Sequence, residues 1–151
     1  MGTQDLATVL RRILPAEAIA GPQSQGSVDR LESALGVRLP PSYREFIKTV
    51  GGISSATTTV SGIFAEDAIG EYAGGAYSDT MTLRAESGLP DNLLVIYPSD
   101  GSFAWCLDLA QRDEVGETPV VLYECEQARI TKKLFRSFAE FLQDFIRIRG
   151  T

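Results

Sequence analysis

Residues 27–52 read SVDRLESALGVRLPPSYREFIKTVGG and predict two short helices separated by a pair of prolines. In the first half, Ser27 is a good N-cap, and Gly36 fits the left-handed position that follows a helix. Apolar residues recur between them on one helical face, at Val28, Leu31 and Leu35. The first half therefore predicts an amphipathic helix that begins after Ser27 and ends before Gly36.

The second half predicts another helix behind the prolines. Leu39, which precedes the two prolines, must be extended, because a residue before a proline is pushed out of the helical region. The helix then restarts in one of two ways: Pro41 occupies its first position, or Ser42 is the N-cap and Glu45 completes a capping box. Its apolar face consists of Tyr43, Phe46, Ile47 and Val50. The pair Gly51-Gly52 ends it, since two glycines make continuation of a helix costly.

The remainder of the chain alternates short apolar runs with turn residues. Asp79 is the expected cap of a helix that Gly88 stops, and Ser137 with Glu140 forms a capping box. Short separations between strands favour antiparallel pairing, because parallel neighbours need a crossover of about a dozen residues. We expect an α+β fold in which helices pack on an antiparallel sheet of about four to six strands. Helices are predicted at 6–13, 79–86 and 137–149, and strands at 57–60, 63–64, 93–97, 103–109 and 120–123.

The chain length predicts a single domain. A domain of 151 residues can bury about 70% of its unfolded surface, so it needs no metal or disulfide for stability. We divide it into residues 1–26, an N-terminal helix and a connector, and residues 27–151, the body of the domain. Asp5 and the Arg11-Arg12 pair argue against a secretory signal, and no apolar run is long enough to cross a bilayer. We expect a cytoplasmic protein that does not bind membranes.

The residue types argue against catalysis. The chain has no histidine, which removes the usual general base, the histidine-paired nucleophiles and most zinc sites. Cys106 and Cys125 are the two thiols, and we expect both as small apolar residues in or beside strands. The acidic residues from Asp113 to Glu117 lack the spacing of a calcium loop, and the glycine pairs lack that of a phosphate loop. We therefore predict no catalytic, cofactor-binding or metal-binding residues.

Charge is distributed unevenly along the chain. Residues 62–128 carry 13 acidic and two basic side chains, whereas residues 129–151 carry two acidic and six basic ones. A block this acidic disfavours binding to nucleic acid, whose phosphates need a basic partner. It favours a basic protein partner, because opposite charge speeds encounter and helps to select the partner. The alternative is that these side chains only keep the protein in solution.

The stretch LGVRLPPSYREFIKTVGG resembles the signature of the SUKH superfamily. The residues that carry the resemblance are Leu35, Gly36, Leu39, Pro40, Tyr43, Phe46, Gly51 and Gly52. Later segments resemble the strand and C-terminal helix blocks of that superfamily: Asp100-Gly101, Trp105–Leu109, Pro119–Val121 and SFAEFLQDF. Val50 is a departure, since members commonly carry asparagine before the glycine pair. The resemblance covers the chain from Ser27 onward and implies a single SUKH-like domain.

The superfamily holds fungal cell-wall assembly regulators and many bacterial immunity proteins that neutralise toxins. The resemblance therefore implies a non-catalytic immunity protein that binds a cognate toxin. A nuclease is one toxin class that fits, since it must be basic to hold nucleic acid and an acidic surface can mimic its substrate. We expect the contacts in the stretch 65–80, a predicted loop with acidic and tyrosine residues and no basic residue. The expected contact residues are Glu66, Asp67, Glu71, Tyr72, Tyr77 and Asp79.

Two other functions stay open at the level of sequence. Because the superfamily includes fungal regulators, the domain could be a scaffold module that binds an endogenous partner. A pair of carboxylates could also hydrolyse glycosides without histidine, although the sequence places no two of the 20 acidic residues face to face. The first alternative predicts a constitutive partner in the same cell. The second predicts glycosidase activity that is lost in carboxylate variants.

Overall fold

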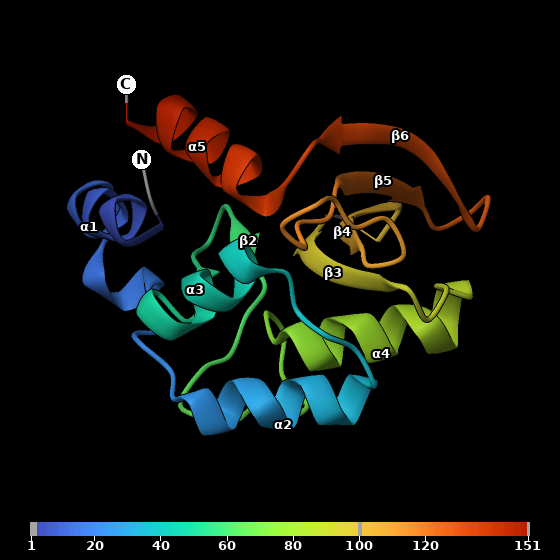
Figure 1. Cartoon of the computed structure of the whole chain (residues 1–151), viewed down its shortest axis with the longest axis horizontal. Coiled ribbons are helices and arrows are strands. Elements are labelled where there is room, and N and C mark those ends of the chain that lie inside the picture. The colour runs from blue at the N-terminus through green and yellow to red at the C-terminus, as the bar shows by residue number, and fades with distance from the viewer. Residues whose placement is uncertain (1–2, 100, 151) are drawn as a thin grey trace.

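The chain folds into helices packed beside a four-stranded antiparallel sheet, with a separate two-stranded sheet, as Figure 1 shows. The structure is a computed structural model that describes residues 3–99 and 101–150, with the side chains of the first helix described from Leu6 onward. The helices are α1 (Thr3–Ile13), a short 3-10 helix (Ala16–Ala18), α2 (Gln25–Leu35), α3 (Pro41–Thr49), α4 (Ala76–Ser87) and α5 (Phe138–Arg149). The strands are β1 (Ile53–Ser54), β2 (Thr59–Val60), β3 (Leu93–Pro98), β4 (Phe103–Asp108), β5 (Val120–Glu124) and β6 (Arg129–Phe135).

Strands β3 to β6 form a four-stranded sheet in sequence order, and every neighbouring pair is antiparallel. Both faces of the central strands are buried, because alternate residues of β4 enter different clusters. Ala104 and Cys106 pack with Leu83 of α4, whereas Trp105 and Leu107 pack with the main core. Strands β1 and β2 form a separate antiparallel pair. The predicted α+β fold with helices on an antiparallel sheet is confirmed.

The first helix of residues 27–52 is present, but it begins earlier than the sequence predicts. Ser24 caps α2, and the amide of Ser27 donates to the Ser24 hydroxyl at 3.1 Å. Ser27 therefore lies inside the first turn, and the predicted N-cap is wrong by three residues. Gly36 ends the helix with φ 66°, in the left-handed conformation that was predicted.

The second helix begins with Pro41 in its first position, so the first of the two predicted alternatives is observed. Ser42 therefore lies in the first turn and is not the N-cap. Its amide and its hydroxyl both donate to the carboxylate of Glu117, at 3.0 and 2.7 Å. Beyond the helix, Gly51 has φ 86° and packs directly on Gly62. A Cβ on Gly62 would lie 1.9 Å from the Gly51 oxygen, so this close approach of two backbones requires glycine.

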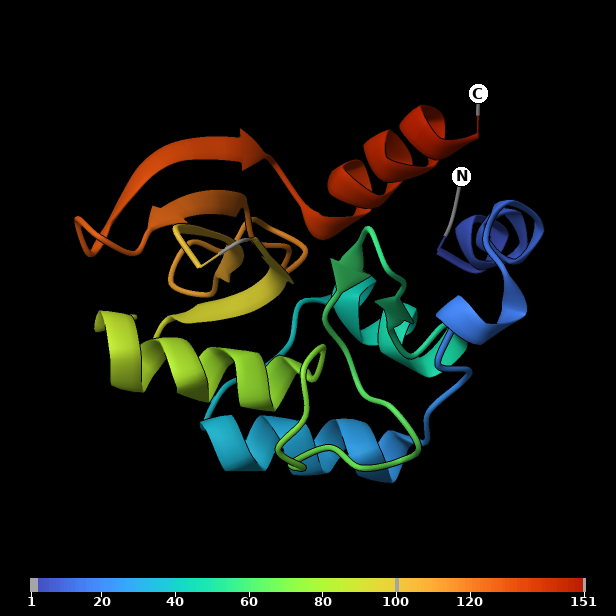
Figure 2. The same ribbon diagram turned by 180° about the vertical axis from the view of Figure 1, so that it is seen from behind.

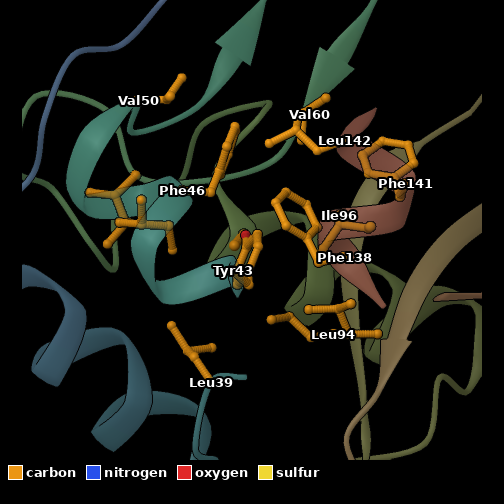
Figure 3. Close-up of a cluster of buried hydrophobic side chains, with 14 of the residues drawn as sticks. Leu39, Tyr43, Phe46, Val50, Val60, Leu94, Ile96, Phe138, Phe141 and Leu142 are labelled. Atoms are coloured by element: carbon orange, nitrogen blue, oxygen red, sulfur yellow. The ribbon is translucent and has the colours of Figure 1, made fainter. Parts of the chain in front are cut away.

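Aromatic side chains from α3 and α5 form the centre of the main core. The Tyr43 ring centroid lies 4.9 Å from that of Phe138, and the Phe46 centroid lies 5.0 Å from it, both in edge-on contacts. Figure 3 shows the three side chains gathered between the two helices. All three are fully buried, and edge-on ring pairs add to the free energy of burial.

Ser61, directly after β2, connects three elements through its polar groups. Its amide donates to the Ile96 carbonyl of β3 at 2.7 Å, and its carbonyl accepts from the Tyr43 hydroxyl at 2.6 Å. Its own hydroxyl donates to the carboxylate of Asp79 in α4 at 2.7 Å. Since Ser61 is completely buried, each of these groups would be costly if left unpaired. The residue therefore fixes where α3, β3 and α4 meet.

The sequence does not predict β1 or β6, and it wrongly predicts a strand at 63–64. Ile63 donates instead to the Gly51 carbonyl at 2.9 Å, which draws this segment toward the end of α3. Strand β6 is not predicted because its first five residues are exposed, and the strand therefore lacks the alternation of apolar and polar residues that indicates a half-buried strand. Its charged side chains, Arg129, Lys132 and Lys133, are typical of a protected sheet edge.

The start of α4 also differs from the prediction. Gly75 is its N-cap, so Asp79 lies in the first turn and turns its side chain to Ser61 instead of capping. The helix ends at Gly88 with φ 65°, as predicted. The predicted connector at 16–26 contains the 3-10 helix and the first residues of α2. No helix in the described part of the chain is both long and apolar enough to cross a membrane.

Residues 62–75, here called the acidic loop, leave the core and return to it at one point. The amide of Gly62 donates to Gly74 at 3.0 Å, and the amide of Ala76 donates to Gly62 at 2.8 Å. Figure 2 shows the loop running along α2 before it reaches α4. There the Glu66 carboxylate accepts from the Ser24 amide at 3.0 Å and from the hydroxyls of Ser24 and Ser27. The loop is therefore closed at its ends and tied to the N-terminus of α2.

Replacing Phe138 with alanine should lower the free energy of unfolding by about 3–5 kcal/mol, because it leaves a cavity where α3 and α5 meet. Equilibrium unfolding in urea measures the change. Phe103→Ala is the control: this ring is 38% exposed, and its loss should cost about 1 kcal/mol or less. Equal destabilisation by both changes would show that the aromatic cluster is not the centre of the core.

Glu66→Gln should lower the Tm at neutral pH, because the hydrogen bonds from Ser27 and Ser24 hold the pKa of Glu66 below its usual value. A carboxyl whose pKa is lowered by folding stabilises the protein above its unfolded pKa and loses that effect as the pH falls through the folded pKa. The difference in Tm should therefore be full at pH 7 and shrink below about pH 4.5. Glu71→Gln, in the same loop, is the control and should change the Tm little at any pH. A difference that is independent of pH would contradict the capping role.

Candidate functional site

The acidic loop and the first turns of α4 carry the six residues expected to contact a partner. Glu71, Tyr72 and Asp79 come together around one hollow, whereas the other three do not belong to its lining. The carboxylate of Glu66 is instead bound by the hydroxyls of Ser24 and Ser27 at the start of α2. Tyr77 is half-buried and packs on the main core. The six residues therefore do not form a single contact patch.

Tyr72 holds the shape of the acidic loop. Its hydroxyl donates to the Asp67 carbonyl at 2.6 Å and accepts from the Phe64 amide at 3.1 Å. Its ring meets the Phe64 ring edge-on with centroids 6.0 Å apart, and it lies against Gly75, where a Cβ would come within 2.8 Å. Partial burial raises the pKa of Tyr72 above its usual value. The side chain is thus fixed, with its hydroxyl used inside the loop.

Asp79 connects α4 to the core and to the loop. One carboxylate oxygen accepts from the Ser61 hydroxyl at 2.7 Å, and the other accepts a longer bond from the Gly74 amide at 3.4 Å. Burial raises the pKa of Asp79 above its usual range and outweighs the two hydrogen bonds, which lower it. Asp79 thus holds the start of α4 against Ser61 and Gly74.

Among the acidic residues of the six, Asp67 and Glu71 are the two whose carboxylates have no partner in the described part of the chain. Both residues are exposed, and neither carboxylate has a hydrogen bond or an ion pair with another residue that the structure describes. By contrast, Glu66 is held by Ser24 and Ser27. The sequence predicts these acidic residues as one group. Only the structure distinguishes the carboxylates that have hydrogen-bond partners from those that have none among the described residues.

The hollow beside α4, here called the α4 hollow, has a volume of about 390 Å³. The end of the acidic loop, α4 and the adjoining ends of β3 and β4 border it, and its lining includes Glu71, Tyr72, Asp79, Leu83, Pro98 and Phe103. Leu83, Pro98 and Phe103 were missed at the level of sequence. They lie in a helix and at two strand ends, and only the antiparallel pairing of β3 with β4 brings them to one place. No local signal in the sequence could have found them.

The cysteines and acidic residues in the described part of the chain form no metal-binding group. No group of three histidine, cysteine, aspartate or glutamate side chains lies close enough there to hold a metal ion. Cys106 is buried and Cys125 half-buried, and neither forms a disulfide. Burial raises the pKa of Cys106 well above its usual value, so this thiol stays protonated and unreactive at neutral pH. What the site offers is acidic surface and an apolar hollow.

Comparison with known proteins gives a family and a fold. A crystal structure described as a protein from Pseudomonas syringae pv. tomato matches with a TM-score of 0.70, covering 93% of this chain and 96% of that one. Since the two chains are 17% identical, this likeness shows the fold alone. No curated protein matches significantly. The family model SUKH_5, described as SMI1-KNR4 cell-wall, matches residues 6–147, and the chain therefore belongs to this SUKH family.

Proposed function

We propose that this protein is a non-catalytic immunity protein that binds and neutralises a cognate basic toxin through its acidic loop and the adjoining α4 hollow. Membership of a SUKH family fits an immunity role and a protein partner. The observation that carries the proposal is the pair of exposed, unengaged carboxylates of Asp67 and Glu71 on a loop closed at its ends. Such a loop presents charge on a rigid frame, which favours binding because little order has to be gained.

The six expected contact residues divide into two groups in this proposal. Asp67 and Glu71 contact the partner directly through free carboxylates. Glu66, Tyr72, Tyr77 and Asp79 hold the loop and α4 in place, while the Tyr72 ring and the Asp79 carboxylate also border the α4 hollow. Only the first two can therefore be reversed in charge without loss of internal hydrogen bonds.

A basic toxin suits the charge of the chain. The acidic loop lies in the segment 62–128, which carries 13 acidic and two basic side chains. Opposite charges on the partners accelerate association and penalise acidic competitors. A nuclease is one class that fits, because its cleft must be basic to hold nucleic acid and an acidic surface can occupy it.

The second candidate function is a regulatory module that binds an endogenous protein. The description of the matching family model, SMI1-KNR4 cell-wall, favours it. The two functions differ in their partner: an immunity protein binds a toxin that kills when expressed alone, and a regulator binds a harmless protein of the same cell.

The deciding experiment is co-expression with the product of the adjacent gene, scored for growth and for co-purification. We expect the neighbour to arrest growth alone and to form a complex with this protein that restores growth. A harmless neighbour, or one that does not bind, would contradict that pairing. A pull-down for an endogenous partner would then decide for the regulatory module.

Reversing both free carboxylates, Asp67→Lys with Glu71→Lys, should weaken toxin binding about tenfold or more at low salt. The loss should appear mainly as slower association, and the dependence of affinity on salt should flatten, because long-range attraction is removed. Titration calorimetry and stopped-flow mixing at several salt concentrations measure these changes.

The matched control for this prediction is Glu114→Lys with Glu126→Lys, which makes the same change in net charge at exposed positions outside the loop. Glu66 is left unchanged in both variants because it caps α2. If the two double variants bind with equal affinity and equal salt dependence, the assignment of the contact site is wrong, although the immunity role itself would stand on the growth assay.

A further inference from the structure

The α4 hollow combines an apolar wall with negative charge. Leu83 and Pro98 contribute aliphatic surface, and Phe103 contributes an aromatic ring that is 38% exposed. Among the described residues of the lining, Glu71 and Asp79 are the charged ones, and none is a lysine or arginine. A hollow of about 390 Å³ is large enough to take a single long side chain. The carboxylates of the lining favour a cation, and its apolar wall favours a cation that is carried on an apolar chain.

The carboxylates of the hollow have capacity for a further donor. Asp79 accepts one hydrogen bond on each oxygen, whereas a carboxylate has about four acceptor positions. Glu71 accepts none from the described residues. Burial already disfavours the charge on Asp79, so a cation that enters the hollow would restore the favourable interactions that Asp79 lost with water.

Aromatic rings in the lining favour a flat cation. Tyr72 and Phe103 both border the hollow, and Tyr72 is fixed by the hydrogen bonds of its hydroxyl. A guanidinium group stacks on ring faces and donates to carboxylates in pairs, whereas an ammonium group is a strongly hydrated point charge. Among natural side chains, arginine therefore matches this lining best.

We propose that the α4 hollow is the anchor site for an arginine side chain of the partner, with its guanidinium between Glu71 and Asp79 and its stem against Leu83 and Phe103. The inference rests on the proposed function, since it names the group of the basic partner that the acidic surface holds. Buried arginine anchors are common among the residues that dominate binding energy at protein interfaces. The rest of the interface then surrounds this anchor.

The test is an NMR titration of the full chain, labelled with ¹⁵N, with N-acetyl-arginine amide as the probe. We expect saturable shifts, with a Kd in the millimolar range, at the backbone amides of Tyr72, Leu83 and Phe103. N-acetyl-citrulline amide has nearly the same shape without the charge, so it should shift these amides far less. The lysine analogue should bind several-fold more weakly than arginine. Absence of saturable shifts at the hollow, or equal shifts with citrulline, would overturn the proposal.

Variants locate the probe within the hollow. Glu71→Gln and Phe103→Ala should each weaken arginine binding several-fold, and Glu114→Gln, an exposed acidic position outside the hollow, should leave it unchanged. Unchanged binding in both hollow variants would overturn the proposal. This result is independent of the growth assay: failed arginine binding with intact rescue removes the anchor site alone. Failed rescue with intact arginine binding removes the immunity role alone.

Discussion

The structure depends on the hydrogen bonds of one buried residue, Ser61. Its carbonyl, amide and hydroxyl face three different elements and each has one partner: Tyr43, Ile96 and Asp79. Because water cannot reach a fully buried group, none of these bonds can be lost without a free energy cost. The same residue thereby joins the aromatic core of α3 and α5 to the helix that lines the candidate site, so the fold and the site share one anchor.

Local signals in the sequence were sufficient for the helices around residues 27–52 and for most of the sheet. Gly36 and the proline pair mark helix ends by backbone constraints that act within a few residues. The N-cap of α2 was misplaced because Ser24 and Ser27 are equally good caps in isolation, and Glu66, 42 positions from Ser24, binds both. Strand β6 was missed because an edge strand with exposed lysines lacks the alternation that reveals a central strand.

Charge composition predicts a candidate site but not the roles of its residues, and the structure gathers only Glu71, Tyr72 and Asp79 around one hollow. A sequence does not distinguish a carboxylate that caps a helix from one that bonds a buried serine or from one that has no partner. Glu66, Asp79 and Glu71 became distinct only through contacts made far along the chain. Phe103 carried no signal, since its position beside α4 results from strand pairing and not from its neighbours in sequence.

The closed ends of the acidic loop separate the residues that hold the fold from those that face solvent. Gly62, Gly74 and Ala76 form the closure, while Ala68 is buried and Tyr72 braces the interior. Between these anchors, the outward positions are Asp67, Ile69, Glu71 and Ala73, all exposed. Substitutions at these positions change the exposed surface of the loop and leave its closure and the buried core intact, so the sequence of the loop can vary while the fold is kept. Under the proposed function, such a domain can follow changes in its partner one substitution at a time, because each step leaves a folded protein.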